Sequence, residues 1–333
     1  MSSISSFSAE KMERLLIDTD IGSDVDDAHA VLYALKASTL SLEGITTVYG
    51  RTDVRAKLAK KLVDYVGRPD IPVAAGRGEP FVRGPHGIWH TGKEGEGVLT
   101  PAEYDLPLSE MGIREDAVDF LIERIMSQPG EYNLVTIGAL TNVAAAFERE
   151  PRLSKNVKRM YLMAGKIPRA PFGLDDEVDD GSPEHNVACD IRAAQIVFST
   201  SVPKTVLPFN VTALVPIRRE RFEKLRTGHP ADEALYALTK VWFDYRDSLF
   251  GRRVGFTCMH DPLTVAAIDH PELLQTAEMR LSVDDYGHLK VGDDGVPATV
   301  CYDVNSDRFE DIFLQTMVRR PQQLADAQLL YRR

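Results

Sequence analysis

Short apolar or β-branched runs alternate with helical patterns along almost the whole chain from about Glu13 onward. Predicted strands occupy residues 14–18, 41–49, 133–138, 157–165 and 204–207, and helical patterns occupy 26–37, 54–66, the segment from 141, and 190–198. Strands that alternate with helices indicate stacked βα units, so the sequence predicts an α/β fold with a mostly parallel open sheet and helices on both faces. No long polar linker or internal repeat interrupts the pattern. We therefore expect one domain over residues 13–333 behind a flexible, Ser-rich segment of residues 1–12.

Three segments depart from this alternation. Residues 78–101 are rich in Gly and His, residues 166–186 are acidic with Pro and Gly, and residues 230–250 predict a long helix. Long irregular segments in a compact fold are commonly functional. Near the end of the chain we expect two hairpin-like strands at 279–291 and 298–304, a turn between them at 292–295, and a helix from Asn305. This hairpin and helix are predicted to be appended to the α/β domain.

Charge and cysteine content restrict the class of protein. The chain has 39 Lys and Arg against 50 Asp and Glu, and its formal charge of -11 repels phosphate backbones, which disfavours nucleic-acid binding. Its three cysteines, Cys189, Cys258 and Cys301, are far apart and form no CxxC pair, which favours a reducing compartment. The first residues lack the basic and apolar regions of a signal peptide, and no run of 18 apolar residues occurs. We expect a cytoplasmic protein without a membrane span.

A cluster of aspartates follows the first predicted strand. Residues 15–28 read LLIDTDIGSDVDDA and contain Asp18, Asp20, Asp24, Asp26 and Asp27. Such crowding of like charge is unfavourable, and a divalent cation at the carboxyl end of a strand relieves it most directly. Oxygen ligands favour calcium or magnesium.

Two alternatives remain open for this cluster. It can be a solvated acidic loop in which Asp18 accepts bonds from backbone donors and Asp24 or Asp26 caps the next helix. The DxD pair of Asp18 and Asp20 is also found in phosphatases that form an aspartyl-phosphate, with one carboxylate as nucleophile and the other as acid.

The segment resembles the nucleoside hydrolases, the inosine-uridine preferring family, whose signature is a strand followed by DxDxGxDDA. Here two extra residues separate Gly22 from the paired aspartates, which makes Asp24 an additional carboxylate. Four later segments match the family in the same order: ITTVYG at 45–50, LVTIGALTN at 134–142, EHN at 184–186 and MHDPL at 259–263. The resemblance extends from Asp18 to about Val265, most of the chain. It implies a nucleoside hydrolase-like fold.

The resemblance also implies a calcium site and a catalytic base. The ligands would be Asp20, Asp27, Asp261 and the backbone carbonyl of Ile137, a set of hard oxygen donors. Asp20 would take a proton from a metal-bound water that attacks the anomeric carbon of the sugar. His260 would protonate the departing base or donate a hydrogen bond to it.

Further residues are implied at the sugar. Asp26 would hold a ribose hydroxyl, and Glu184 and Asn186 would bind near the 5′-hydroxyl. Where the family commonly has a ribose-binding Asn after the second strand, this chain has Arg51. Arg51 either pairs with the extra Asp24, the interpretation we favour, or contacts a phosphate or carboxylate on an unusual substrate.

The resemblance also indicates residues that contact the base. In the Gly/His-rich loop His90 is the natural candidate, with His86 and Lys93 as alternatives in other registers. Trp89 either stacks on the nucleobase or anchors the loop. In the long helical segment, core packing is the default for aromatic side chains, and the resemblance indicates Tyr245 as a contact from a lid.

The sequence therefore predicts calcium-dependent hydrolysis of ribonucleosides to ribose and free base. By resemblance the enzyme would be a homodimer or homotetramer acting on a small-molecule nucleoside. Three alternatives are a hydrolase of another N-riboside, such as a modified nucleoside or nicotinamide riboside, a metal-dependent phosphohydrolase, and a non-catalytic riboside-binding protein.

Overall fold

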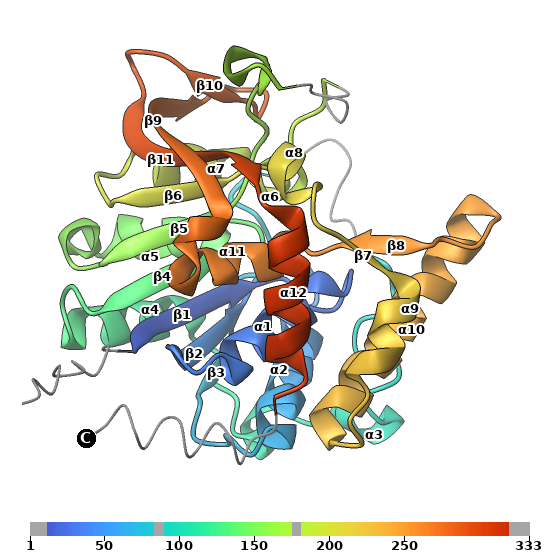
Figure 1. Ribbon diagram of the computed structural model, residues 1–333. Helices are drawn as coiled ribbons and strands as arrows, with labels where there is room; N and C mark the ends of the chain where they lie inside the picture. Colours follow the sequence, from blue (N-terminus) through green and yellow to red (C-terminus); the bar gives the residue numbers. More distant parts are fainter. Residues whose placement is uncertain (1–11, 83–89, 175–180, 320–333) are drawn as a thin grey trace, which may run out of the picture.

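The computed structural model describes residues 12–82, 90–174 and 181–319. Its strands are β1 (Glu13–Thr19), β2 (Leu40–Thr47), β3 (Val73–Ala75), β4 (Tyr132–Thr136), β5 (Arg159–Met163), β6 (Lys204–Leu207), β7 (Pro216–Arg218), β8 (Phe256–Cys258), β9 (Leu274–Val283), β10 (Leu289–Val291) and β11 (Val296–Val304). Nine of them form one sheet in the order β10-β9-β11-β6-β5-β4-β1-β2-β3 (Figure 1), and β7 pairs with β8 separately. The neighbouring strands β11, β6, β5, β4, β1, β2 and β3 all pair in parallel. Strand β9 is antiparallel to both of its neighbours, β10 and β11. The prediction of a mostly parallel sheet is confirmed.

Helices cover both faces of this sheet. They are α1 (Asp26–Lys36), α2 (Thr52–Tyr65), α3 (Pro101–Asp105), α4 (Ala117–Ser127), α5 (Thr141–Arg149), α6 (His185–Cys189), α7 (Ile191–Ser199), α8 (Phe209–Thr212), α9 (Arg219–Phe222), α10 (Pro230–Phe250), α11 (His260–Asp269) and α12 (Ser306–Met317). Alternate residues of β1 point to opposite faces: Leu15 and Ile17 pack with α1, α2, α11 and α12, and Leu16 packs with α4, α5 and α7. Each face of the sheet thus has its own apolar core.

The C-terminal strands differ from the prediction. The single strand expected at 279–291 is wrong, because β9 ends at Val283 and β10 begins only at Leu289. The Asp284 carboxylate accepts hydrogen bonds from the backbone N–H of Tyr286 and of His288, each at 2.9 Å, and Gly287 adopts a φ of +85°. This turn reverses the chain. β11 then pairs in parallel with β6, so the hairpin extends the central sheet.

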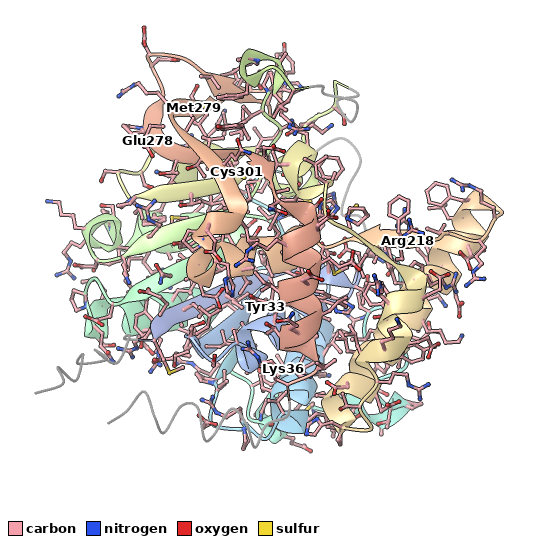
Figure 2. The ribbon with its side chains drawn as sticks, in the orientation of Figure 1. Tyr33, Lys36, Arg218, Glu278, Met279 and Cys301 are labelled. Atoms are coloured by element: carbon pink, nitrogen blue, oxygen red, sulfur yellow. The ribbon has the colours of Figure 1, made fainter. Side chains whose placement is uncertain are left out.

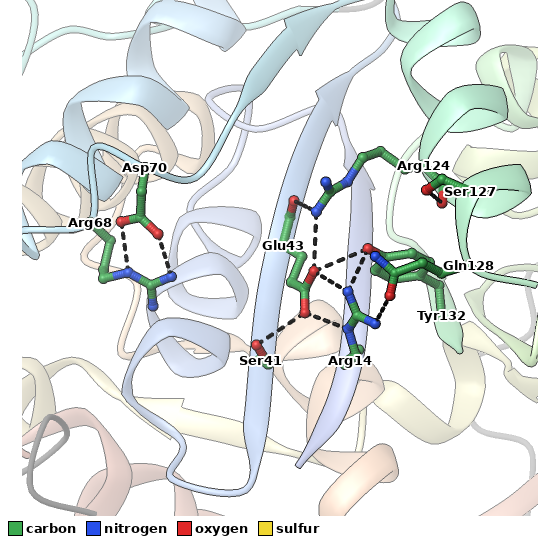
Figure 3. Close-up of polar contacts among 9 residues, drawn as sticks. All are labelled: Arg14, Ser41, Glu43, Arg68, Asp70, Arg124, Ser127, Gln128 and Tyr132. Carbon is green, nitrogen blue, oxygen red and sulfur yellow. Dashed lines mark hydrogen bonds and ion pairs between the residues drawn. The ribbon is translucent and has the colours of Figure 1, made fainter. Parts of the chain in front are cut away.

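Polar side chains fix the amino-terminal edge of the sheet (Figure 3). The Glu43 carboxylate on β2 accepts hydrogen bonds from Arg14 Nη2 at 2.6 Å, Tyr132 Oη at 3.0 Å and Arg124 Nη2 at 3.1 Å. These contacts join the starts of β1, β2 and β4 to α4, and the two guanidiniums offset the Glu43 charge. This arginine-rich edge is opposite the carboxyl edge of the sheet, where the aspartates that follow β1 lie.

A buried ion pair joins three helices on the other side of the molecule. Figure 2 shows Tyr33 and Lys36 of α1 beside α12. The Lys36 ammonium pairs with the Asp232 carboxylate of α10 and donates to the Met317 carbonyl of α12 at 2.6 Å. Both members of the pair are almost fully buried, 1% and 4% exposed. In the part of the chain that the structure describes, no helix is long and apolar enough to cross a bilayer.

Candidate active site

The carboxyl ends of the central strands surround a cavity of about 280 Å³. Its wall is formed by Asp20, Asp24, Asp26, Asp27, Ile137, Met163, Glu184, His185, Asn186, Phe209, His260 and Asp261. Asp20 and Asp24 lie in the loop between β1 and α1, and Asp26 and Asp27 begin α1. Ile137 directly follows β4, and His260 and Asp261 begin α11. Ligands of α/β proteins commonly bind at this edge of the sheet.

Eight residues predicted from the sequence meet in this cavity. They are the four predicted metal ligands Asp20, Asp27, Ile137 and Asp261, together with Asp26, Glu184, Asn186 and His260. The roles of these eight residues remain predictions. Three more residues of the wall, Met163, His185 and Phe209, were not predicted. Met163 ends β5 and Phe209 follows β6 closely, so their positions at strand ends were the available signal. His185 lies inside the EHN segment and begins α6, so that segment was its signal.

A fully buried arginine holds the loop between β1 and α1. Arg55 of α2 donates to the backbone carbonyls of Asp20, Ile21 (3.0 Å) and Tyr49 (2.7 Å), and to Ser23 Oγ (2.8 Å). Gly138 lies against the same loop, since a Cβ there would come within 2.8 Å of both the backbone nitrogen and Oδ1 of Asp20. Asp20 is therefore fixed from two sides.

The aspartates are also linked to one another. Thr19 Oγ1 donates to Asp27 Oδ1, and the backbone N–H of Asp261 points at Asp26 Oδ2 from 3.4 Å. Carboxylate oxygens of Asp24, Asp26 and Asp27 lie within 4.8 Å of one another. The two residues inserted before Asp26 thus bring a further carboxylate into the cavity.

Burial and mutual repulsion disfavour the charged forms of these groups. Burial raises the pKa of Asp20, although the Arg55 guanidinium opposes the rise. Burial and the neighbouring carboxylates raise the pKa values of Asp26, Asp27 and Asp261 well above the ordinary range. A divalent cation reverses this effect, and a set composed only of carboxylate and carbonyl oxygens fits a hard ion such as calcium or magnesium. The donor set therefore fits the predicted metal.

Asp18, unlike the other aspartates of the cluster, does not line the cavity. It is buried, and its Oδ1 accepts hydrogen bonds from Thr46 Oγ1 at 2.5 Å and Asn142 Nδ2 at 2.8 Å. Burial raises its pKa to about 7. Its carboxylate thus binds side chains and not the expected backbone donors, and α1 follows Val25 without a side-chain cap, so the solvated-loop alternative is wrong. Asp18 does not line the cavity, which argues against its use as a phosphatase nucleophile.

Backbone donors fix the acidic residue of the EHN segment. The Glu184 carboxylate caps α6 and accepts from the N–H groups of Gly165 (2.9 Å), Asn186 (2.8 Å) and Val187 (3.2 Å). Burial raises the Glu184 pKa, and these N–H groups oppose the rise. Asn186 Nδ2 donates to the Met163 carbonyl at 3.0 Å. Both side chains reach the cavity in fixed orientations.

His260 lines the same cavity, where it lies between a hydroxyl and a ring. Its Nδ1 is 2.8 Å from Thr212 Oγ1, and its imidazole stacks on Phe209 with ring centroids 5.1 Å apart and planes 18° apart. Burial lowers the pKa of His260 to about 4. The imidazole is therefore held in one plane at the cavity wall.

The predicted contacts of the base lie outside this cavity. The pairing of Arg51 with Asp24 is wrong: Arg51 Nε and Nη2 each donate to Asp53 at 2.9 Å, because a carboxylate two residues away matches the guanidinium fork. Arg51 and the exposed His90 line a separate hollow with Tyr104. Tyr245 and Trp242 of α10 line a small hollow that shares Asp24 with the main cavity. Trp89 and His86 lie outside the described residues.

Comparison with known proteins gives this arrangement its context. A family model described as inosine-uridine preferring nucleoside hydrolase matches residues 15–311. The chain is 32% identical over 292 residues to the inosine-uridine preferring nucleoside hydrolase of Leishmania major, covering 84% of this chain and 86% of that protein. It is 31% identical over 273 residues to the probable uridine nucleosidase 2 of Arabidopsis thaliana, covering 80% of each. A solved purine-preferring ribonucleoside hydrolase from Gardnerella vaginalis superposes with a TM-score of 0.77 at 25% identity, over 95% of this chain and 99% of that one.

The chain belongs to the inosine-uridine preferring nucleoside hydrolase family. It is an N-glycosyl hydrolase that acts on ribonucleosides. The family is metal-dependent, and the aspartate cluster offers the oxygen ligands that a metal requires.

Proposed function

We propose that the protein hydrolyses the N-glycosidic bond of ribonucleosides in a calcium-dependent reaction, releasing ribose and free base. The observation that carries this proposal is the convergence of Asp20, Asp27, Asp261 and Ile137 on one buried cavity. These residues would hold the ion through three carboxylates and a backbone carbonyl. When bound, calcium would supply a Lewis acid that makes a water molecule more acidic and orients the ribose hydroxyls.

Asp20 is the general base in this proposal. It would take the proton of the attacking water while the water oxygen bonds to the anomeric carbon, and Arg55 and Gly138 support this role because they fix the Asp20 backbone and carboxylate. The transition state places positive charge on the sugar, which suits a cavity lined by carboxylates. The same charge disfavours substrates whose reacting group is anionic.

Other cavity residues would bind the substrate. Asp26 would accept a hydrogen bond from a ribose hydroxyl, and Glu184 and Asn186 would hold the 5′-hydroxyl end. His260 would donate a hydrogen bond to the departing base. Tyr245 and Trp242 line a hollow that shares Asp24 with this cavity, which supports a role for Tyr245 in covering the base.

The cellular setting and assembly are also proposals. Three unpaired cysteines support a cytoplasmic location, and the family resemblance supports a homodimer or homotetramer of one-domain chains. Light scattering of the purified protein after size-exclusion chromatography tests the assembly. A monomer at micromolar concentration would contradict it.

A ribose-release assay tests the chemistry. Purified protein with calcium is given inosine, adenosine, guanosine, uridine, cytidine and nicotinamide riboside in turn. Asp20→Ala and Asp261→Ala are expected to lose activity and calcium affinity while keeping the wild-type circular dichroism spectrum. Asp293→Asn, in an exposed turn, is the matched control and should behave as wild type. Near-normal turnover by either cavity variant would refute the proposed site.

A further inference from the structure

Thr212 contacts the proposed leaving-group residue His260 from helix α8, a short helix that the sequence did not predict. It ends the short helix α8, its side chain is fully buried, and it lies 48 residues before His260 in the chain. Its Oγ1 is 2.8 Å from His260 Nδ1. Because Nδ1 faces Thr212, Nε2 is the ring nitrogen left for the cavity that His260 lines.

The direction of this hydrogen bond decides what Nε2 can do. A neutral imidazole carries one N–H, so a hydroxyl that donates to Nδ1 leaves the proton on Nε2, and a hydroxyl that accepts from Nδ1 leaves Nε2 bare. Thr212 Oγ1 has one other acceptor, the Phe209 carbonyl at 3.2 Å. That carbonyl already accepts the Ala213 N–H at 2.8 Å. The contact with His260 is 0.4 Å shorter than the contact with the Phe209 carbonyl, which favours donation to His260.

The charge of the cavity favours the same arrangement. Asp24, Asp26 and Asp261 share its wall with His260. An N–H that faces carboxylates is attracted to them, whereas a bare nitrogen lone pair is repelled. Phe209 stacks on the ring and keeps it from rotating.

We propose that Thr212 is a positioning residue that donates its hydroxyl proton to His260 Nδ1 and so keeps the Nε2–H directed at the departing base. This inference rests on the proposed function of the cavity. As the bond between the anomeric carbon and the base nitrogen breaks, its electron pair moves onto the base, and the Nε2–H hydrogen bond stabilises that charge. The Nε2 proton stays on His260 in this step.

Leaving-group dependence tests this role, since a base needs a donor and a 4-nitrophenolate does not. Thr212→Val removes the hydroxyl at nearly constant volume and is expected to lower kcat for inosine and uridine about tenfold or more, with KM changed less than about twofold. The rate for 4-nitrophenyl riboside should stay within about twofold of wild type. Thr212→Ser should restore nucleoside hydrolysis.

Thr264→Val is the matched control. Thr264 is equally buried and also contacts His260, but its Oγ1 donates to the backbone carbonyl at 3.1 Å and not to the ring. Its removal should leave the ratio of nucleoside to nitrophenyl riboside rates unchanged. Equal losses on both substrate types in Thr212→Val would overturn the proposal.

A readout that needs no activity separates this proposal from the proposed function. Nitrogen-15 NMR of labelled protein, with His260→Gln to assign the signals, should show the Nε2–H tautomer in wild type and a mixture in Thr212→Val. An Nδ1–H tautomer in wild type would refute the role of Thr212 even in an active enzyme. Absence of ribose release from every substrate, with the Nε2–H tautomer present, would refute the proposed function and leave the hydrogen-bond assignment standing.

Discussion

Gly138→Ala tests whether the position of Asp20 limits the reaction. The added Cβ would lie 2.8 Å from the Asp20 backbone nitrogen and Oδ1, whereas ordinary van der Waals contact begins at 3.4 Å, so Asp20 has to move by about 0.6 Å. Gly138 has no positive φ, so the backbone accepts alanine and only the contact is new. A misplacement of about 1 Å in a catalytic group lowers rates by about a hundredfold, and we therefore expect kcat to fall about tenfold. Overpacking should lower the free energy of unfolding by about 1–3 kcal/mol.

Gly255→Ala provides the control for this substitution. Gly255 also lacks a positive φ, and a Cβ there would meet no atom within 4 Å. Ribose release, calcium affinity by titration calorimetry and urea denaturation should be measured on both variants and on wild type. If Gly138→Ala kept wild-type kcat and calcium affinity while Gly255→Ala did the same, the reasoning that places Asp20 at the reacting water would be refuted.

Three further predictions concern stability. Asp232→Ala should lower the free energy of unfolding by about 3–5 kcal/mol, because it leaves the Lys36 charge buried alone. Urea denaturation measures this loss. The double variant Lys36→Met/Asp232→Leu should recover most of it, because it removes both buried charges. Burial lowers the pKa of Lys204 to about 8, so the folded state binds fewer protons than the unfolded state between pH 8 and 10.5. The stability of wild type relative to Lys204→Met should therefore rise across that window by up to about 3 kcal/mol, and a flat difference would contradict a buried neutral amine. Arg51→Ala should change the unfolding free energy by less than about 1 kcal/mol, since the ion pair with Asp53 is exposed, and a larger loss in thermal denaturation would show that Arg51 has an additional structural role.

The sequence predicted the parts of the fold that depend on local pattern. Buried strands such as β1 and β4 contain short apolar runs, and a helix follows each of them as predicted. The pattern failed at β9 and β10, where the expected strand 279–291 contains a turn. That turn depends on the Asp284 carboxylate accepting two backbone N–H groups, a local interaction that hydrophobic alternation does not report.

The sequence predicted the site residues that lie at the ends of strands and helices. The carboxylates after β1 and the His260–Asp261 pair lie at strand or helix ends, and parallel topology brings such ends to one edge. Side-chain partners were not predictable, because they depend on packing between distant elements. Thr212 and Phe209 reach His260 only through the placement of α8 against α11. Arg51 pairs with Asp53 and not with the expected Asp24, because Asp53 is only two residues away in the chain.

The carboxylates at the two ends of the sheet differ in whether an arginine side chain neutralises them. At the amino-terminal edge Arg14 and Arg124 neutralise Glu43 directly (Figure 3). At the carboxyl edge, within the described residues, the one buried guanidinium near the aspartates is Arg55, and it donates to backbone carbonyls and a hydroxyl. The carboxylates of the cavity are thus left for an ion or a substrate, which is the arrangement a metal-assisted hydrolase needs.

The most direct test of the account is the rate of ribose release from uridine and inosine by chelator-treated protein as calcium is added back. The account predicts no release after chelation and a saturable recovery with calcium, which is weakened in Asp27→Asn but not in Asp293→Asn. Ribose release that is unchanged by chelation, or its absence when calorimetry shows bound calcium, would contradict the central claim.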